Sequence, residues 1–135
     1  MIVLDNDVLV KVGGANPDPA VVNHLQQYRS DEWTIPSIVA FEFYRSCNGR
    51  SEMKRARTRL TSTLDRIVDF TGNTALEAAY LEERLREQGV SLDPVDLLNL
   101  ATAHEAGGTF VTHNKNDFDT GPLQSLVDVD VVVTS

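Results

Sequence analysis

Four acidic side chains stand in apolar or strand-like surroundings, where a carboxylate without a partner is costly. They are Asp5, Glu42, Asp96 and Asp117. Asp5 follows the apolar run 2–4, and Glu42 lies between Phe41 and Phe43. A chain that places several carboxylates in such positions is expected to give them a common partner, and a metal cation is the simplest one.

Oxygen ligands of this kind suit the hard cations Mg²⁺ and Mn²⁺. Protein carboxylates that hold one or two such ions support the hydrolysis of phosphate esters, because the metal activates water and stabilises charge on the attacking and leaving oxygens. Without the metal, mutual repulsion is expected to raise the pKa of some of these carboxylates.

Each carboxylate also has a local alternative. Asp5 could cap the helix that follows it, and Asp96 could be favoured by the dipole of its own helix. Asp117 could be a turn residue. Glu42 could form a buried ion pair with Arg45 in the same predicted helix.

Short runs of β-branched residues alternate with helical patterns, as in parallel sheets with helical crossovers. The expected strands are 2–4, 33–35, 66–70, 109–112 and one near 131–133. The expected helices are 6–13, 18–28, 37–48, 51–64, 74–89 and 93–107, with a loop at 14–17 and an irregular stretch after 112. The expected N-terminal caps are Asp18, Ser37, Asp93 and a capping box from Thr74 to Glu77. The pattern predicts one α/β domain over 1–135, a three-layer α/β/α sandwich with a mostly parallel sheet of about five strands.

This fold gives the carboxylates a reason to converge. Sites in open α/β sheets form outside the carboxyl ends of the strands. Asp5 and the stretch 114–117 directly follow two predicted strands, Glu42 lies early in the helix after a third, and Asp96 lies in the first turn of the helix before 109–112. All four are therefore expected at the same edge of the sheet.

Composition limits the alternatives. The formal net charge is −8, which is unusual for a protein that binds phosphates through Lys and Arg. The segment 50–59 has five basic residues and one acidic residue, a local charge of +4, so the rest of the chain has −12. Cys47 is the only cysteine, which excludes an intrachain disulfide. No apolar run approaches the roughly 20 residues of a membrane span, and we expect a cytoplasmic protein.

Four motifs together resemble those of the PIN-domain family, and within it the small toxins of the VapC type. The stretch 2–9 is similar to its N-terminal motif, with Asp5 as the acidic residue. The stretch 35–43 is similar to the second motif, with Glu42. The stretches 96–103 and 111–118 are similar to the third and fourth, with Asp96 and Asp117. One such motif is weak evidence, but four in order are fairly specific.

The resemblance implies a metal-dependent endoribonuclease, the toxin of a type II toxin–antitoxin pair. Asp5, Glu42, Asp96 and Asp117 are then the catalytic residues and hold Mg²⁺ or Mn²⁺, and Asn114 is a secondary ligand or orients water. The resemblance further implies RNA as substrate, a homodimer, and a small antitoxin protein as partner.

Two positions depart from the family pattern. Asn6 stands where Thr or Ser is more common, and Asn114 where many relatives have a second Asp, which lowers the negative charge available for a second metal. The basic segment 50–59 could contact the RNA backbone or be a solvated helix face, and His113 and Lys115 are weaker candidates for phosphate contacts.

Two other functions remain open on the sequence. The opening Asp5-Asn6-Asp7 also resembles the first motif of haloacid-dehalogenase-type phosphatases, with Asp5 as nucleophile and Lys115 as the catalytic lysine. That function would leave Glu42 and Asp96 without a role. The second alternative is a PIN fold that has lost catalysis and only binds RNA or a partner.

Overall fold

A parallel five-stranded sheet lies at the centre of the molecule, in the order β3-β2-β1-β4-β5. The computed structural model describes residues 1–14 and 16–133. The strands are β1 (Ile2–Leu4), β2 (Trp33–Pro36), β3 (Arg66–Val68), β4 (Thr109–Thr112) and β5 (Val129–Val131). All four pairings between neighbouring strands are parallel, which confirms the predicted sheet.

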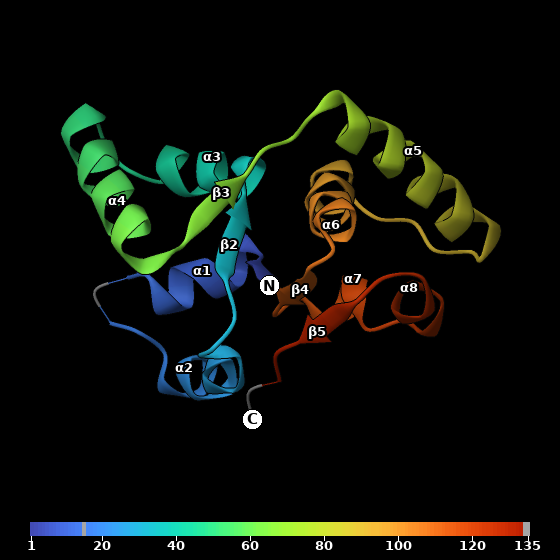
Figure 1. Ribbon diagram of the computed structural model, residues 1–135, viewed down its shortest axis with the longest axis horizontal. Helices are drawn as coiled ribbons and strands as arrows, with labels where there is room; N and C mark the ends of the chain where they lie inside the picture. The colour runs from blue at the N-terminus through green and yellow to red at the C-terminus, as the bar shows by residue number, and fades with distance from the viewer. Residues whose placement is uncertain (15, 134–135) are drawn as a thin grey trace.

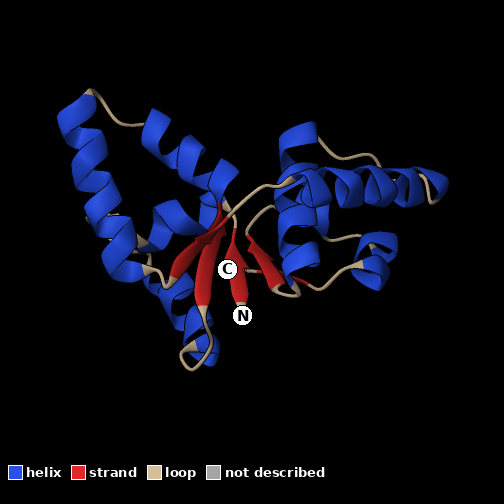
Figure 2. Ribbon diagram, turned by 45° about the horizontal axis from the view of Figure 1, so that its top comes forward, coloured by secondary structure: helices blue, strands red, loops and turns tan. Residues whose placement is uncertain are grey.

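Helices cover both faces of this sheet, and the two views in Figures 1 and 2 show them on either side of the strands. The helices are α1 (Asn6–Val12), α2 (Pro19–Leu25), the 3₁₀ helix η1 (Gln26–Tyr28), α3 (Ser37–Arg45), α4 (Arg50–Thr63), α5 (Gly72–Glu87), α6 (Pro94–Ala106), α7 (Lys115–Phe118) and α8 (Gly121–Leu126). The predicted three-layer α/β/α sandwich is therefore confirmed.

Successive side chains of the central strands contribute to two separate hydrophobic cores, one on each face of the sheet. Ile2 and Leu4 of β1 pack with residues of α1 to α4, whereas Val3 between them packs with residues of α5 to α8. Successive side chains of a strand point to opposite faces of its sheet. Because both faces are covered, the strands are apolar on both sides, and β1 is completely buried.

The predicted caps at Asp18 and Asp93 are confirmed. Each aspartate precedes a proline and accepts a hydrogen bond from a backbone N–H of the first helical turn, at 3.0 Å in both cases. The proline that follows lacks an N–H and has a fixed φ, so it suits the first helical position.

Two other predicted caps are wrong. Ser37 is the first residue of α3 and not its cap, and its hydroxyl accepts a hydrogen bond from the N–H of Phe70 after β3. The capping box of α5 is formed by Thr71 and Thr74, not by Thr74 and Glu77. Thr71 already has extended backbone angles, so α5 begins at Gly72, two residues earlier than predicted.

Several predicted boundaries also shift. The helix predicted to end at 48 ends at Arg45, the strand predicted to reach 70 ends at Val68, and the helix predicted to reach 28 continues after Leu25 as η1. The last strand is Val129–Val131 rather than 131–133, and the stretch after β4 contains α7 and α8. These two helices are too short for a helical period to show in the sequence. The predicted loop at 14–17 includes Ala15, which lies outside the described residues.

Substitution at Gly108 is a direct test of the close packing around β1. A Cβ atom there would lie 2.9 Å from Cγ2 of Val3 and 3.0 Å from Cε of Met1. Gly108→Ala is expected to lower the free energy of unfolding by about 1–3 kcal/mol, since the buried strand cannot move aside freely. Gly72→Ala is the matched control, because a Cβ at this helical position meets nothing within 4 Å. Urea denaturation of both variants checks the prediction, and equal stabilities would contradict it.

Candidate metal and active site

The site is built where the central strands end. Asp5 follows β1 directly, and Thr112 is the last residue of the neighbouring strand β4. The two strands are held in register with Leu4 opposite Val111. As a result the side chain of Asp5 and the hydroxyl of Thr112 come together at the carboxyl edge of the sheet.

Asp5 is the buried centre of this site, with only 7% of its surface exposed. Its Oδ1 accepts a hydrogen bond from the N–H of Asn6 at 2.8 Å, and its Oδ2 accepts one from the hydroxyl of Thr112 at 2.9 Å. The first bond makes Asp5 the N-cap of α1, as the local alternative proposed. Asp5 does more than cap this helix, because its second hydrogen bond joins it to β4.

Burial raises the pKa of Asp5 from its ordinary 3.8 to about 7, and the negative charges of Asp7 and then Asp96 add to the effect. The two hydrogen bonds oppose this shift without cancelling it. Repulsion between carboxylates was expected from the sequence, and the structure shows burial to be the larger cause.

Asp96 lies in the first turn of α6, within electrostatic range of the other acidic side chains. Partial burial raises its pKa to about 6, with contributions from the charges of Asp117, Asp93, Glu42 and Asp7. The structure therefore brings all four predicted carboxylates into one electrostatic neighbourhood, together with Asp7 and with Asp93, the N-cap of α6.

Glu42 has an unexpected partner. The amide of Asn99 donates a hydrogen bond from Nδ2 to Oε1 of Glu42 at 3.3 Å, between α6 and α3. The alternative of an ion pair with Arg45 is wrong, because the Arg45 guanidinium lies over the ring of Phe41, 5.6 Å from its centroid. Arg45 and Phe41 are four residues apart on the exposed side of α3, whereas Glu42 faces α6.

Asn114 and Asp117 are joined in one small motif. Asn114 caps α7 by accepting a hydrogen bond from the N–H of Asp117, and its Nδ2 donates to Oδ2 of Asp117 at 2.7 Å. The backbone N–H of Asn114 donates to Thr112, whose hydroxyl holds Asp5. Asn114 therefore orients the carboxylate of Asp117 and is connected to Asp5 through one hydroxyl.

The interpretation of this site from the sequence missed four contributors. Asp7 accepts hydrogen bonds from the N–H of His113 at 3.1 and 3.2 Å, and Lys11 contacts Nδ1 of His113. Thr112 supplies the hydroxyl described above. Asn99 is buried, and its Oδ1 has no hydrogen-bond partner. A polar residue among the apolar residues of α6 was the available signal for Asn99, since buried polar groups normally have partners.

The donor set fits a hard divalent cation, but the side chains are not preassembled around one. In the described ranges 1–14 and 16–133, no group of three or more Asp, Glu, His or Cys side chains is arranged to hold a metal ion. Glu42 is held by Asn99 and Asp117 by Asn114, as expected for carboxylates that repel one another. The buried Oδ1 atoms of Asn6 and Asn99 lack partners. The predicted metal-binding roles of Asp5, Glu42, Asp96, Asp117 and Asn114 stay predictions.

Comparisons with known proteins point to one family. The model of the PIN domain matches residues 2–120. Among solved structures, a chain from VapBC2 of Rickettsia felis, bound to a fragment of its promoter DNA, is 23% identical with a TM-score of 0.73, and the match covers 97% of this chain and 98% of that one. A search among curated proteins found no match.

Two more solved structures have the same fold over the full length of both chains. A chain of a toxin–antitoxin complex from Klebsiella pneumoniae is 18% identical with a TM-score of 0.75. VapC20 of Mycobacterium tuberculosis, described as a toxin that cleaves the sarcin-ricin loop, is 19% identical with a TM-score of 0.61. None of the helices in the described part of the chain is long and apolar enough to cross a membrane.

The raised pKa of Asp5 predicts how stability depends on pH in the presence of a chelator. The folded state holds the proton up to about pH 7 and the unfolded state only to about 3.8, so this group lowers stability as pH rises through that window. The full shift corresponds to roughly 4 kcal/mol, and lost hydrogen bonds offset part of it. At pH 8 with EDTA, Asp5→Asn should be more stable than the wild type by about 1–3 kcal/mol.

At pH 5 the difference should be clearly smaller, because Asp5 is then protonated in the folded state, although it is ionised in the unfolded state above about pH 3.8. Urea denaturation at both pH values measures it, with Asp31→Asn as a control that removes an exposed carboxylate. Mn²⁺ at pH 8 should reduce the stability difference between Asp5→Asn and the wild type, because it should stabilise the wild type more than the variant. A stability difference that is the same at pH 5 and pH 8 would show that the charge of Asp5 is not the cause.

Proposed function

Because this chain belongs to the PIN domain family, we propose that it is a metal-dependent endoribonuclease that hydrolyses phosphodiester bonds of RNA. The observation that carries the proposal is the convergence of Asp5, Glu42, Asp96 and Asp117 at the carboxyl edge of the sheet. Asp5 and Asp96 keep raised pKa values there because of burial and of the other carboxylates. A bound divalent cation would relieve both effects.

The four carboxylates would hold Mg²⁺ or Mn²⁺, which supplies activation of water and charge stabilisation at the phosphate. The chain's own residues have separate tasks. Thr112 and the N–H of Asn6 keep the oxygens of Asp5 in place, Asn114 orients Asp117, and Asn99 orients Glu42. The nearby Lys11 and His113 offer nitrogen donors to a phosphate group.

The phosphatase alternative is less well supported. It requires Asp5 to attack a substrate as a nucleophile, but both of its oxygens already accept hydrogen bonds. It also leaves Glu42 and Asp96 without a task, although they stand in the same electrostatic neighbourhood.

A basic helix can compensate for the acidity of the site toward RNA. Arg50, Lys54, Arg55, Arg57 and Arg59 of α4 are all exposed. Among the residues that the structure describes, no salt bridge involves any of them. Figure 2 shows α3 and α4 on one side of the strand ends and α5 and α6 on the other. We propose that α4 contacts the RNA backbone while the metal occupies the site.

The fold neighbours support a biological role. Solved structures with this fold include toxin–antitoxin complexes. We propose that the protein is a type II toxin that acts in the cytoplasm as a homodimer and is inhibited by a small antitoxin protein. Co-expression with the product of an adjacent small gene, followed by size-exclusion chromatography, tests this role separately from the chemistry.

The nuclease proposal predicts metal-dependent cleavage. The purified protein should cleave labelled RNA in the presence of Mg²⁺ or Mn²⁺ and lose this activity with EDTA. Asp96→Asn should lower the rate at least about 100-fold, since a central metal ligand is lost. Asp31→Asn is the charge-matched control and should keep wild-type activity. Cleavage that survives EDTA or the Asp96 substitution would overturn the mechanism.

Asn99 gives a second, independent prediction. Asn99→Leu removes the donor to Glu42 and also a buried oxygen without a partner. The melting temperature should stay the same or rise, whereas the cleavage rate should fall about tenfold because Glu42 is no longer oriented.

Thr102→Val is the control for this effect. Thr102 is also a buried polar residue of α6, but its hydroxyl donates to the carbonyl of Leu98 in its own helix. The control should retain the cleavage rate. Wild-type cleavage by the Asn99→Leu variant at both saturating and limiting Mn²⁺ would show that Asn99 does not position Glu42.

A further inference from the structure

The sheet has an open edge at β5, the last strand in its order. The N–H of Phe110 donates to the carbonyl of Asp128 at 2.9 Å, and the N–H of Val132 donates to the carbonyl of Thr112 at 2.8 Å. In a parallel strand the residues between such partners direct their backbone groups to the opposite side. The N–H and C=O groups of Val129 and Val131 therefore face outward, and no described strand lies beside them.

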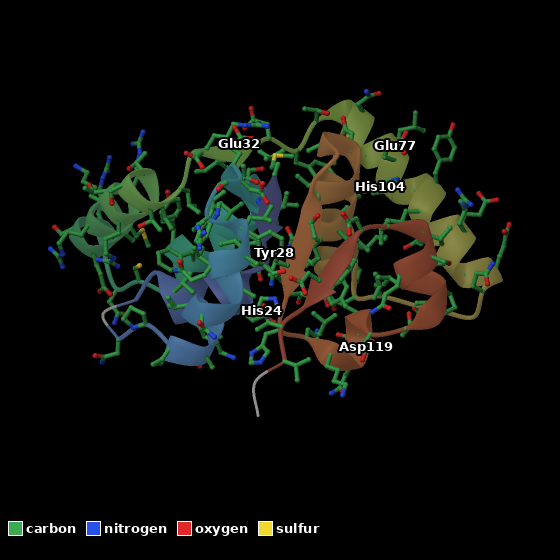
Figure 3. The ribbon with its side chains drawn as sticks, turned by 60° about the horizontal axis from the view of Figure 1, so that its bottom comes forward. His24, Tyr28, Glu32, Glu77, His104 and Asp119 are labelled. Carbon is green, nitrogen blue, oxygen red and sulfur yellow. The ribbon has the colours of Figure 1, made fainter. Side chains whose placement is uncertain are left out.

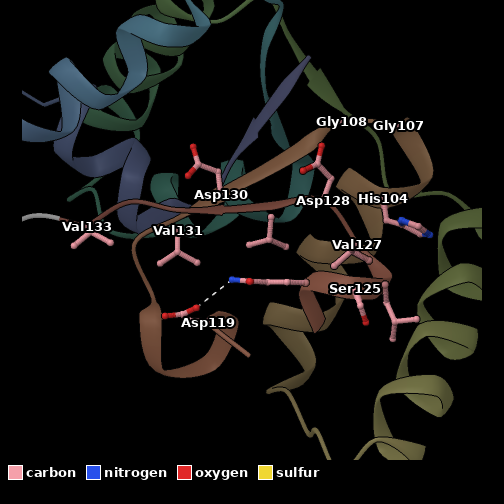
Figure 4. Close-up of a pocket in the computed structure, with 13 residues that line it drawn as sticks. His104, Gly107, Gly108, Asp119, Ser125, Val127, Asp128, Asp130, Val131 and Val133 are labelled. Carbon is pink, nitrogen blue, oxygen red and sulfur yellow. Dashed lines mark hydrogen bonds between the residues drawn. The ribbon is translucent and has the colours of Figure 1, made fainter. Parts of the chain in front are cut away.

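A groove of about 920 Å³ follows this edge (Figure 4). Its lining includes the valines of β5 and its continuation, together with residues of α8 and the loop after α6. Val133 has 71% of its surface exposed. The groove thus combines an open row of backbone groups with apolar side chains, the two features used in strand addition.

The groove is acidic. Its lining contains Asp119, Asp128 and Asp130, and none of the described lining residues is Lys or Arg. Asp119 accepts a hydrogen bond from the Gln124 amide, and Asp128 accepts one from the hydroxyl of Thr109. These neutral donors hold the carboxylates in place and leave their charges uncompensated.

Asp130 is fixed more firmly. It accepts hydrogen bonds from the Tyr28 hydroxyl at 2.5 Å and from Nε2 of His24 at 2.8 Å. Figure 3 shows His24 of α2 and Tyr28 of η1 near β5, with Asp119 farther along the molecule. Two side chains from the first quarter of the chain thereby hold the edge strand from one face.

We propose that this edge binds an extended, basic segment of another protein, which adds a sixth strand beside β5. The segment would alternate Lys or Arg with apolar residues. In Figure 4, Asp128 and Asp130 lie on one side of β5 and Val131 and Val133 on the other, so alternate side chains of an added strand meet carboxylates and valines in turn. Residues 127–133 can pair with about five to seven residues at roughly 3.3 Å each.

The negative charge of the groove favours a basic segment over a second copy of the chain and over nucleic acid. A second copy of the chain pairing through its own β5 would bring Asp128 and Asp130 near the same residues of its partner, and like charges across a strand pair are unfavourable. Nucleic acid is excluded by the same carboxylates. Five of the twelve basic residues of this chain lie in the helix α4, which offers no extended segment.

A labelled peptide tests the proposal without any need for nuclease activity. The probe is fluorescein-labelled Lys-Val-Arg-Val-Lys-Val, and its control is the same peptide with Glu in place of the basic residues. Fluorescence anisotropy should show saturable binding of the basic peptide, weakening with added salt, and at least about tenfold weaker binding of the acidic one. Amide NMR shifts on binding should concentrate at residues 127–133.

Two substitutions separate the backbone and charge contributions. Val131→Pro removes an N–H that points outward and leaves every hydrogen bond to β4 intact, and proline is tolerated at such positions of edge strands. This variant should bind the peptide at least about tenfold more weakly, with little change in melting temperature. The double variant Asp119→Asn with Asp128→Asn should weaken binding by a similar factor. Asp31→Asn should bind as the wild type does.

Several results would overturn the proposal. They are wild-type affinity in both variants, NMR shifts centred on Asp5 and Asp96 instead of β5, and no saturable binding below about 1 mM. A dimer in sedimentation that Val131→Pro dissociates would assign the edge to a second copy of the chain and would equally reject the basic segment.

Discussion

The buried carboxylate of Asp5 is the constraint around which this protein is organised. A charge in that position is unfavourable, and the surrounding structure responds by supplying two hydrogen bonds from different elements. One bond begins α1 and the other joins β1 to the end of β4. The same residue therefore sets the start of a helix, the alignment of two strands and the electrostatic character of the site.

The other groups of the site position the carboxylates, but they do not form a complete set of metal ligands. Three of the more exposed carboxylates have a partner that limits their movement: Asn99 for Glu42, Asn114 for Asp117 and the backbone of His113 for Asp7. Burial, and then repulsion from the neighbouring carboxylates, raise the pKa of Asp96. In such a site a cation contributes twice, because it neutralises the charges and draws together oxygens that otherwise keep their distance.

Much of this arrangement could be predicted from the sequence, and the exceptions have physical reasons. Parallel strands buried on both faces leave apolar runs that are readily recognised, and an acidic residue after such a run indicates the sheet edge. The partner of Glu42 could not be predicted, because it depends on how α3 and α6 pack. The capping box at Thr71 was misplaced because Thr74 suits either role, and the extended backbone at Thr71 decided between them.

The order of the strands has a consequence for folding during synthesis. β1 is synthesised before the other strands, yet it lies between β2 and β4, and β4 ends at Thr112. Val111 and Val132 complete the core that contains Leu4. Contacts between such distant parts of a chain form late. A ribosome must therefore deliver the chain through β4 before Asp5 meets Thr112, and until then the growing chain carries no assembled site.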